Sequence, residues 1–194
     1  MSLDRNDVPW LKRGSQRAAV AQALRKPMTG TEICSAARTF NPRIQLRDVW
    51  HLLRQMQDRE MVYCLNPRLV TGRLFALTER GRDEVHAAFG VVVAVPPQHI
   101  DWRKYSWVVR AKIRRLTLAA LGQLESNTGT SQTATAIRKF LRTENAVGLN
   151  PVMRAIKDLV KLGLVQQDGV TDERSCKLYR LTRMGRRILD QQQY

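Results

Sequence analysis

The chain has 194 residues, and its 33 Lys and Arg against 17 Asp and Glu give a formal net charge of +16. Hydrophobic and charged contents of 43% and 26% are ordinary for a globular protein, and this length allows one domain or two. No apolar run approaches the roughly 20 residues of a membrane span. The polar N-terminus lacks the core of a signal peptide, so we expect a cytoplasmic protein. The cation excess is typical of proteins that bind a phosphate backbone or an anionic surface.

The first part of the chain predicts a polar arm over residues 1–14 and then two helices. Ser15 is suited to cap the first helix, which is expected to end before Pro27 because proline does not continue a helix interior. The second helix is expected to open at Thr29 to Glu32.

A third helix is expected over residues 45–59, followed by a hairpin. Its apolar residues follow the i, i+3, i+4, i+7 spacing of a helix with one buried face, namely Leu46, Val49, Trp50, Leu53 and Met56. Two short apolar runs on either side of the 66–72 loop predict two β-strands that form a wing. A helix over 79–88 completes this part of the chain.

Residues 90–109 are predicted to connect two domains. Val91 to Val95, with the two prolines that follow, fits either a strand or an extended connector. Arg103 to Arg115 is the densest basic stretch. It fits either a linker that follows phosphates or an amphipathic helix that Trp102 and Trp107 anchor by packing.

The second half of the chain predicts the same series of elements. A first helix contains Leu116, Leu118 and Leu121, and a second contains Ala136, Ile137, Phe140 and Leu141. Asn150 is predicted to cap the third helix, with Pro151 at its first position. A hairpin is expected over 164–181, and a last helix ends at 191–193.

The two halves repeat one another in register. Val49 to Leu53 aligns with Val152 to Ile156 at an offset of 103, and the segments that close the hairpins align at an offset of 104. Two repeats are too few for a solenoid, so each repeat must be a small domain that folds by itself. We therefore predict an arm over 1–14, a domain over 15–89, a connector over 90–109 and a second domain over 110–194.

Both repeats end with the motif Leu-Thr-x-x-Gly-Arg, at 77–82 and at 181–186, behind three helices and two strands. This order resembles the winged helix-turn-helix domain, in particular that of the MarR- and PadR-like regulators. The resemblance implies a mainly α-helical α+β fold with small β-hairpin wings, arranged as two winged helix-turn-helix domains in tandem. It also implies double-stranded DNA as the partner.

In a helix-turn-helix, the second helix of the pair lies in the major groove and its exposed side reads base edges. The residues predicted to do so are Gln45, Arg47, His51 and Arg54 in the first domain and Asn150, Arg154, Lys157 and Lys161 in the second. Arg suits guanine and Gln suits adenine, so these unlike faces predict unlike half-sites. The alternative is that these residues are solvated charges of ordinary amphipathic helices.

Basic residues outside the two helices are further candidates for DNA contacts, namely Arg68 and Arg73 in the first wing, Arg174 and Lys177 in the second, and Arg103 and Lys104 in the connector. Such contacts position DNA without reading its sequence. Wing cations also protect edge strands against aggregation, which is the alternative here. The threonines near the start of each second helix fit phosphate contacts or, more simply, helix caps; they are Thr29, Thr31, Thr133 and Thr135.

No pattern typical of an enzyme accompanies these features. The three histidines have no Cys or carboxylate at the spacing of a metal site or a catalytic triad, and no Gly-rich phosphate loop occurs. The three cysteines lack C-x-x-C spacing and are interpreted as reduced thiols. We therefore expect a binding protein with no catalytic residue, no metal and no cofactor.

The main expectation is a nucleoid-associated transcriptional regulator that places its two domains on adjacent major-groove segments. The alternative is a replication or chromosome-segregation factor in which one winged helix docks on a protein. In this alternative the first domain is the weaker DNA-binding domain, because Asp48 and Leu52 lie on or near its recognition face. A homodimer through 79–88, 91–95 and 186–193 is a further hypothesis. RNA binding is disfavoured, because aromatic residues that stack bases are missing from the predicted sheets.

Overall fold

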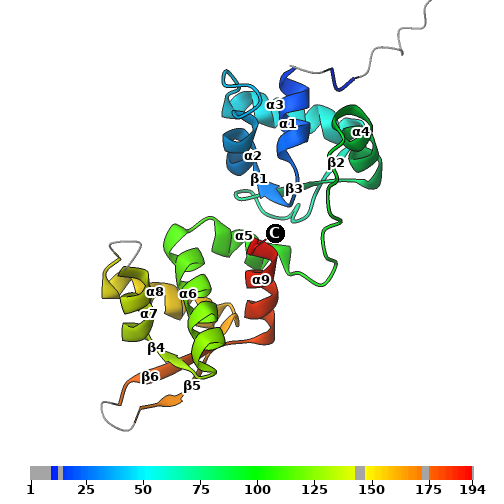
Figure 1. Ribbon diagram of the computed structural model, residues 1–194. Helices are drawn as coiled ribbons and strands as arrows, with labels where there is room; N and C mark the ends of the chain where they lie inside the picture. Colours follow the sequence, from blue (N-terminus) through cyan, green and yellow to red (C-terminus); the bar gives the residue numbers. More distant parts are fainter. Residues whose placement is uncertain (1–9, 13–14, 143–146, 172–174, 194) are drawn as a thin grey trace, which may run out of the picture. The chain divides into compact units, whose positions relative to one another are not determined.

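A computed structural model describes residues 10–12, 15–142, 147–171 and 175–193. The chain divides into two compact units, Met1–Gln98 and His99–Tyr194, and each unit is described by itself. Figure 1 shows that both units have the same order of elements, apart from one additional helix at the start of the second, with helices packed beside a small antiparallel sheet. The predicted α+β fold with two winged helix-turn-helix domains in tandem is confirmed.

The first unit runs through α1, β1, α2, α3, β2, β3 and α4. Their bounds are Gln16–Ala23, Met28–Thr29, Gly30–Ala37, Leu46–Asp58, Val62–Cys64, Leu74–Leu77 and Glu79–Phe89. The sheet has the strand order β1-β3-β2. Strand β1 did not follow from the sequence, because two residues are too few to show an alternating pattern.

The second unit runs through α5, α6, β4, α7, α8, β5, β6 and α9. Their bounds are Trp102–Val109, Lys112–Thr128, Gln132–Thr133, Ala134–Arg142, Leu149–Lys161, Val165–Val170, Lys177–Leu181 and Arg183–Gln193. Its strand order, β4-β6-β5, repeats that of the first unit. Met28 pairs with Phe75 and Gln132 pairs with Tyr179, so the pairing of the short strand keeps the offset of 104.

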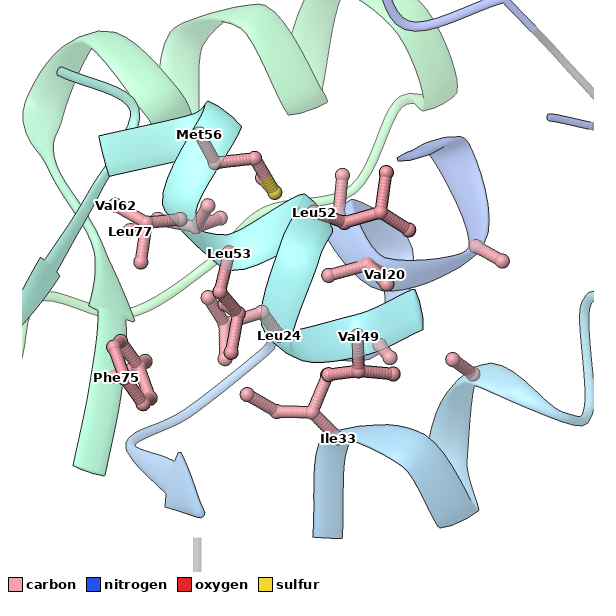
Figure 2. Packing of buried hydrophobic residues seen from close by; sticks show 14 of the residues in the cluster. Val20, Leu24, Ile33, Val49, Leu52, Leu53, Met56, Val62, Phe75 and Leu77 are labelled. Atoms are coloured by element: carbon pink, nitrogen blue, oxygen red, sulfur yellow. The ribbon is translucent and has the colours of Figure 1, made fainter. Parts of the chain in front are cut away.

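The core of the first unit forms where α1, α2, α3 and the wing strands meet (Figure 2). Val49, Leu53 and Met56 of α3 are buried there, as the spacing predicts. Leu52 is also buried, against the prediction that it lies on or near the exposed face. Because α1 and α2 both pack on α3, the buried stripe of this helix is wider than the stripe of a helix with one neighbour.

The closing motif has the same physical role in both units. Thr78 Oγ1 donates to the carbonyl oxygen of Glu60 at 2.6 Å and accepts from Gly81 N at 3.0 Å, which joins the end of the α3 region to the start of α4. Thr182 Oγ1 makes the matching bonds with Gly163 O and Gly185 N, at 2.8 and 3.1 Å. The threonine therefore caps the last helix and also fixes its direction.

The glycine of this motif is required by a close approach of two backbone segments. A Cβ atom at Gly81 would lie 2.0 Å from the carbonyl oxygen of Met61, and one at Gly185 would lie 2.0 Å from that of Leu164. Both obstacles are backbone atoms, which cannot rotate away as a side chain would. No other residue type fits without displacing the wing or the helix.

Side-chain caps follow the predictions at three helices and depart from them at one. Ser15 Oγ accepts from Ala18 N, Thr29 Oγ1 from Glu32 N, and Thr133 Oγ1 from Ala136 N. The prediction that Asn150 caps the third helix of the second unit is wrong, because Gly148 is the N-cap. Pro151 still lies in the first turn, where its missing N–H costs no intrahelical bond.

The predicted connector contains a helix. Helix α5 lies within residues 90–109 and packs on α6, whereas Val91 to Val95 forms no strand. Trp102 packs edge-on against Tyr105, with ring centroids 5.4 Å apart. Across the described residues, no helix is long and apolar enough to cross a lipid bilayer.

Candidate nucleic-acid interface

The exposed side of α8 carries cations. Val152, Ala155, Ile156 and Leu159 face the core of the second unit. The predicted contact residues are all exposed on the remaining surface of the helix, namely Asn150, Arg154, Lys157 and Lys161. The last three are spaced i, i+3 and i+7, which places them along one side of the helix.

These cations are available to an external anion. None of the ion pairs among the described residues involves Arg154, Lys157 or Lys161. Asp158, the single acidic residue of α8, is half-buried and interacts electrostatically with Arg114. Burial lowers the pKa of Arg114, Asp158 opposes this shift, and Arg110 adds to it. The acidic residue of α8 therefore offsets a cation of α6 and leaves the exposed cations unneutralised.

The preceding helix, α7, adds two exposed cations that the sequence analysis missed. Lys139 and Arg142 lie in its last turn and are exposed. Helix α7 contains three cations and no acidic residue, and α8 contains three cations and one, so together they carry a net charge of +5. The sequence could have indicated these two contacts, because Lys139 and Arg142 are spaced i and i+3 in a predicted helix that has no carboxylate.

The exposed side of α3 has a different composition. Gln45, Arg47, His51 and Arg54 are exposed as predicted. Two residues predicted to be buried share this side, because Leu46 is 39% and Trp50 is 42% exposed. The recognition helix of the first unit thus presents an indole and an isobutyl group between its polar side chains.

Trp50 is held in place by close contacts beneath its ring. Its centroid lies 5.8 Å from that of Phe75 on β3, in an edge-on arrangement. A Cβ atom at Gly30 would lie 2.6 Å from Trp50 Cζ2, so a larger residue at the start of α2 would displace the indole from this position. One part of the ring is packed and the rest is open to solvent.

Acidic residues cancel the cations of α3. The helix contains two Arg and two Asp, and α2 contains one Glu, so the pair of helices has a net charge of −1. Arg47 Nε lies 3.7 Å from Asp48, whose other carboxylate oxygen accepts from Gln45 N at 2.9 Å. His51 Nε2 lies 2.7 Å from Gln55 Nε2, within hydrogen-bond distance. The charge that α3 offers to a phosphate backbone is therefore small.

The first wing is a compact loop between two short strands. Asn66 holds it: its Oδ1 accepts from the buried Leu74 N at 2.8 Å, and its Nδ2 donates to Gly72 O at 3.2 Å. Arg68 is exposed, while Arg73, also exposed, donates from Nε to Leu69 O at 2.8 Å. Both predicted cations thus lie on a loop close to the body of the unit.

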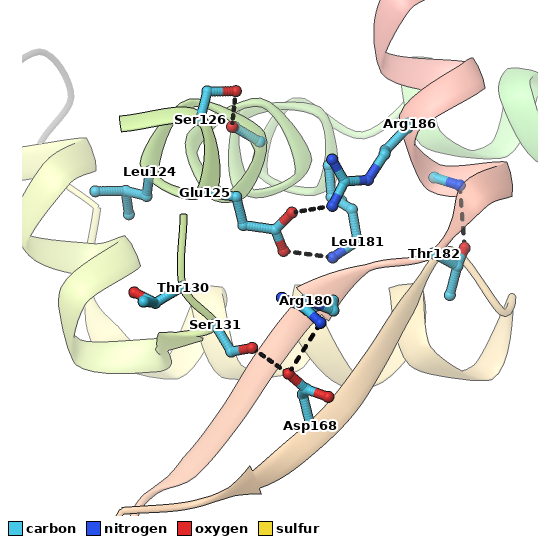
Figure 3. A network of polar contacts seen from close by, with 12 residues as sticks. Leu124, Glu125, Ser126, Thr130, Ser131, Asp168, Arg180, Leu181, Thr182 and Arg186 are labelled. Atoms are coloured by element: carbon cyan, nitrogen blue, oxygen red, sulfur yellow. Dashed lines mark hydrogen bonds and ion pairs between the residues drawn. The ribbon is translucent and has the colours of Figure 1, made fainter. Parts of the chain in front are cut away.

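The second wing is a longer antiparallel ladder with a bulge. The register between β5 and β6 shifts between Gln167 and Val170, where Gly169 has a φ of +123°. Asp168 at this bulge accepts from Ser131 Oγ and lies 3.6 Å from Arg180 Nη1 (Figure 3). Lys177 is exposed at the start of β6, and Arg174 lies outside the described residues.

The basic residues at the start of α5 are placed by a cap. Asp101 Oδ1 accepts from the backbone amides of Arg103 and Lys104, both at 3.1 Å. Trp107 is half-buried and lies under the guanidinium of Arg114, with Cζ 3.2 Å from the ring centroid. Trp107 thus packs within the second unit, as in the helix alternative, and DNA contact by Arg103 and Lys104 stays a prediction.

Metal-binding and redox groups are sparse in the part of the chain that the structure describes. There, no three His, Cys, Asp or Glu side chains gather in a way that would hold a metal ion. Cys34, Cys64 and Cys176 are free thiols that are buried, half-buried and exposed, respectively.

Comparisons with known proteins add little to this description. Neither a protein-family profile nor a curated protein sequence matches the chain. Among solved structures, ScpB from Mycobacterium tuberculosis is similar over 94% of each chain, with 14% identical residues and a TM-score of 0.28.

Proposed function

We propose that this chain is a nucleoid-associated double-stranded DNA-binding protein in which the second unit makes the main DNA contact and the first unit docks on a protein. The observation that carries the proposal is the inequality of the two helix-turn-helix surfaces. Helices α7 and α8 have a net charge of +5, and α2 and α3 have a net charge of −1. Binding to the phosphate backbone depends on such cations, because they release condensed counterions.

The surface of α8 suits the major groove of DNA. The groove admits one α-helix, and Arg154 has the donor geometry for two hydrogen bonds to guanine. Lys157 and Lys161 continue the same side of the helix toward its C-terminal end, where they would contact phosphates. Lys177 on the wing and the cations of α7 provide further contacts that position the helix without reading bases.

The first unit favours a protein partner. Exposed aromatic side chains that are partly packed are common at the centres of protein interfaces, where charge is depleted. Trp50 and Leu46 on α3 have this character. This observation favours a replication or chromosome-segregation factor over a transcriptional regulator that reads DNA with both units.

Fluorescence anisotropy on a labelled random-sequence duplex, over a salt series, tests the proposal. We expect the double variant Lys157→Ala/Lys161→Ala to reduce the magnitude of the slope of log K against log salt by about 1.8, or about 0.9 per lost phosphate contact. The matched control is Arg47→Ala/Arg54→Ala on α3, which removes the same number of cations. We expect the control to keep most of the wild-type affinity.

Two results would contradict the proposal. The first is equal loss in the two double variants, which would restore the regulator with two DNA-reading domains. The second is the absence of wild-type binding at micromolar protein and physiological salt, which would leave RNA or an acidic protein as the partner of the basic surface.

A further inference from the structure

A cavity opens beside the recognition helix of the second unit. It has a volume of about 190 Å³ and lies between the start of α7, one side of α8 and strand β6. Its walls include Ala134, Leu149, Met153 and Tyr179. Leu149 is partly exposed, and burial raises the pKa of Tyr179, so this phenol stays neutral across the physiological range.

The first unit shows what fills the corresponding space. The offsets of the repeat match Met153 with Trp50, Ala134 with Gly30, and Tyr179 with Phe75. In the first unit the indole of Trp50 occupies the space between the start of α2 and β3, against Gly30 and Phe75. In the second unit the shorter, unbranched Met153 replaces that indole, and the space that the Cβ of Ala134 does not take is open.

We propose that this cavity is a binding site for a free aromatic molecule of one or two rings, which packs against Tyr179 as the Trp50 indole packs against Phe75 but lies farther out than that indole, because the Cβ of Ala134 takes the space that Gly30 leaves open. The size fits, because apolar cavities of about 150 Å³ accept a benzene ring. The chemistry also fits, since a polarisable thioether and a phenol ring make favourable contacts with aromatic ligands.

The ligand would be only partly enclosed. The Trp50 side chain remains partly exposed in its own unit, and the cavity of the second unit is likewise open to solvent. For a molecule with about nine heavy atoms, we therefore expect weak binding, with a Kd of about 0.1–1 mM. Polar or charged substituents on the ring would project outward, toward Lys177 and solvent.

Ligand-observed fluorine NMR with fluoroindole as the probe tests the site on the full chain. We expect saturable line broadening with the wild-type protein. The variant Ala134→Gly/Met153→Trp provides the second unit with its own indole, and the glycine is included because an alanine Cβ would collide with that ring. In this variant we expect the affinity for fluoroindole to fall by at least about tenfold, because the new indole fills the site.

A matched control places the same tryptophan elsewhere on the same helix. Val160 is 38% exposed on α8 and does not line the cavity. We expect Val160→Trp to bind fluoroindole as the wild type does. The reciprocal variant Gly30→Ala/Trp50→Met is expected to open a cavity in the first unit and to increase the number of bound probe molecules.

A second measurement keeps the test valid if the filled variant does not fold. The exposed Cys176 lines the cavity, whereas Cys34 is buried and Cys64 is half-buried in the first unit. We expect indole to slow the alkylation of Cys176 by iodoacetamide in the wild type and to leave Cys64 unchanged. None of these readouts uses DNA, so they are independent of the proposed DNA binding.

Three results would overturn the proposal. The first is no saturable response up to the solubility limit of indole, together with no protection of Cys176. The second is an unchanged affinity for fluoroindole in a folded Ala134→Gly/Met153→Trp variant. The third is a response to N-acetyltryptophanamide without a response to indole. The last result would assign the cavity to an aromatic side chain of a protein partner.

Discussion

At the same turn of the recognition helix, the first unit has Trp50 and the second has Met153. The tryptophan fills the space over Gly30 and Phe75 and adds an apolar group to a helix whose charges cancel. The methionine leaves a cavity beside a helix with three exposed cations. The same topology thus carries two different surfaces, because the surface depends on residues that the core does not constrain.

The wings differ in the same way. In the first unit one side chain, Asn66, holds a short loop by two bonds to the backbone. In the second unit a longer ladder forms, and the polar contacts of Asp168 lie on its surface. A loop whose main buried contacts come from one side chain is easier to disrupt than a ladder of several backbone pairs.

The largest expected effect is at the glycine of the closing motif, which both units share. We expect Gly81→Ala and Gly185→Ala each to cost about 3–5 kcal/mol, because the added Cβ meets a backbone carbonyl oxygen that cannot move aside. Hydrogen–deuterium exchange read by mass spectrometry would follow each unit separately. Gly81→Ala should increase exchange in residues 1–98, and Gly185→Ala should increase it in residues 99–194. A stability loss below about 1 kcal/mol in either variant would show that the backbone segments can move apart to accept the Cβ.

A buried carboxylate distinguishes the second unit. Glu125 accepts from Leu181 N at 2.6 Å and from Arg186 Nη2 at 3.0 Å (Figure 3). We expect Glu125→Ala to cost about 2–3 kcal/mol, since the buried amide of Leu181 loses its acceptor, and Glu125→Gln to cost about half as much. Chemical denaturation measures both.

The control for Glu125 is Arg82→Ala. Arg82 occupies the position of Arg186 in the repeat, but it donates to the carbonyl oxygen of Leu77 at 3.2 Å. We expect this variant to cost less than about 1 kcal/mol. Equal costs for Glu125→Ala and Arg82→Ala would contradict the importance given to the buried carboxylate.

The wing comparison predicts a smaller effect. Asn66→Ala should destabilise the first unit by about 2 kcal/mol, because Leu74 N is buried and loses its partner. Asp168→Ala should cost less than about 1 kcal/mol, since its ion pair with Arg180 is partly exposed. Thermal unfolding of both variants checks the order, and the reverse order would mean that the bulge stabilises the second wing.

The ends of the recognition helices offer a stabilising change. Gly163 follows α8 with a φ of +68°, and Glu60 has the corresponding place after α3 with a φ of +57°. We expect Glu60→Gly to stabilise the first unit by about 1 kcal/mol, because glycine adopts this conformation without a Cβ penalty. Gly163→Ala should destabilise the second unit by a similar amount. Denaturant midpoints measure both changes, and no change at Glu60 would mean that its side chain compensates.

The smallest effect on DNA binding is expected at Asp48. Replacing it with Ala removes the acceptor for Gln45 N and the negative charge near Arg47. We expect a loss of about 1 kcal/mol in stability and an increase of about twofold in DNA affinity at low salt. Anisotropy measures the second effect. A much larger gain would show that one carboxylate is what prevents α3 from binding DNA.

Much of the fold could be predicted from the sequence. The apolar spacing located α3 and α8, and the repeat in register required two units of one kind. Ser15, Thr29 and Thr78 lie at the helix starts where their hydroxyls act as caps. These features are local, since they depend on residues within one or two helical turns of each other.

The sequence alone determined the two-unit winged-helix architecture, the closing motif and the positions of the cations on α8. Only the tertiary structure decided that Leu52 is buried, that Trp50 is half exposed, and that strands as short as β1 exist. The reason is physical: helical spacing defines an apolar stripe, but the packing of α1, α2 and β3 around α3 determines how wide that stripe becomes and which residues at its edge meet solvent. The cavity over Ala134 is of the same kind, because it depends on what three separate segments leave unfilled.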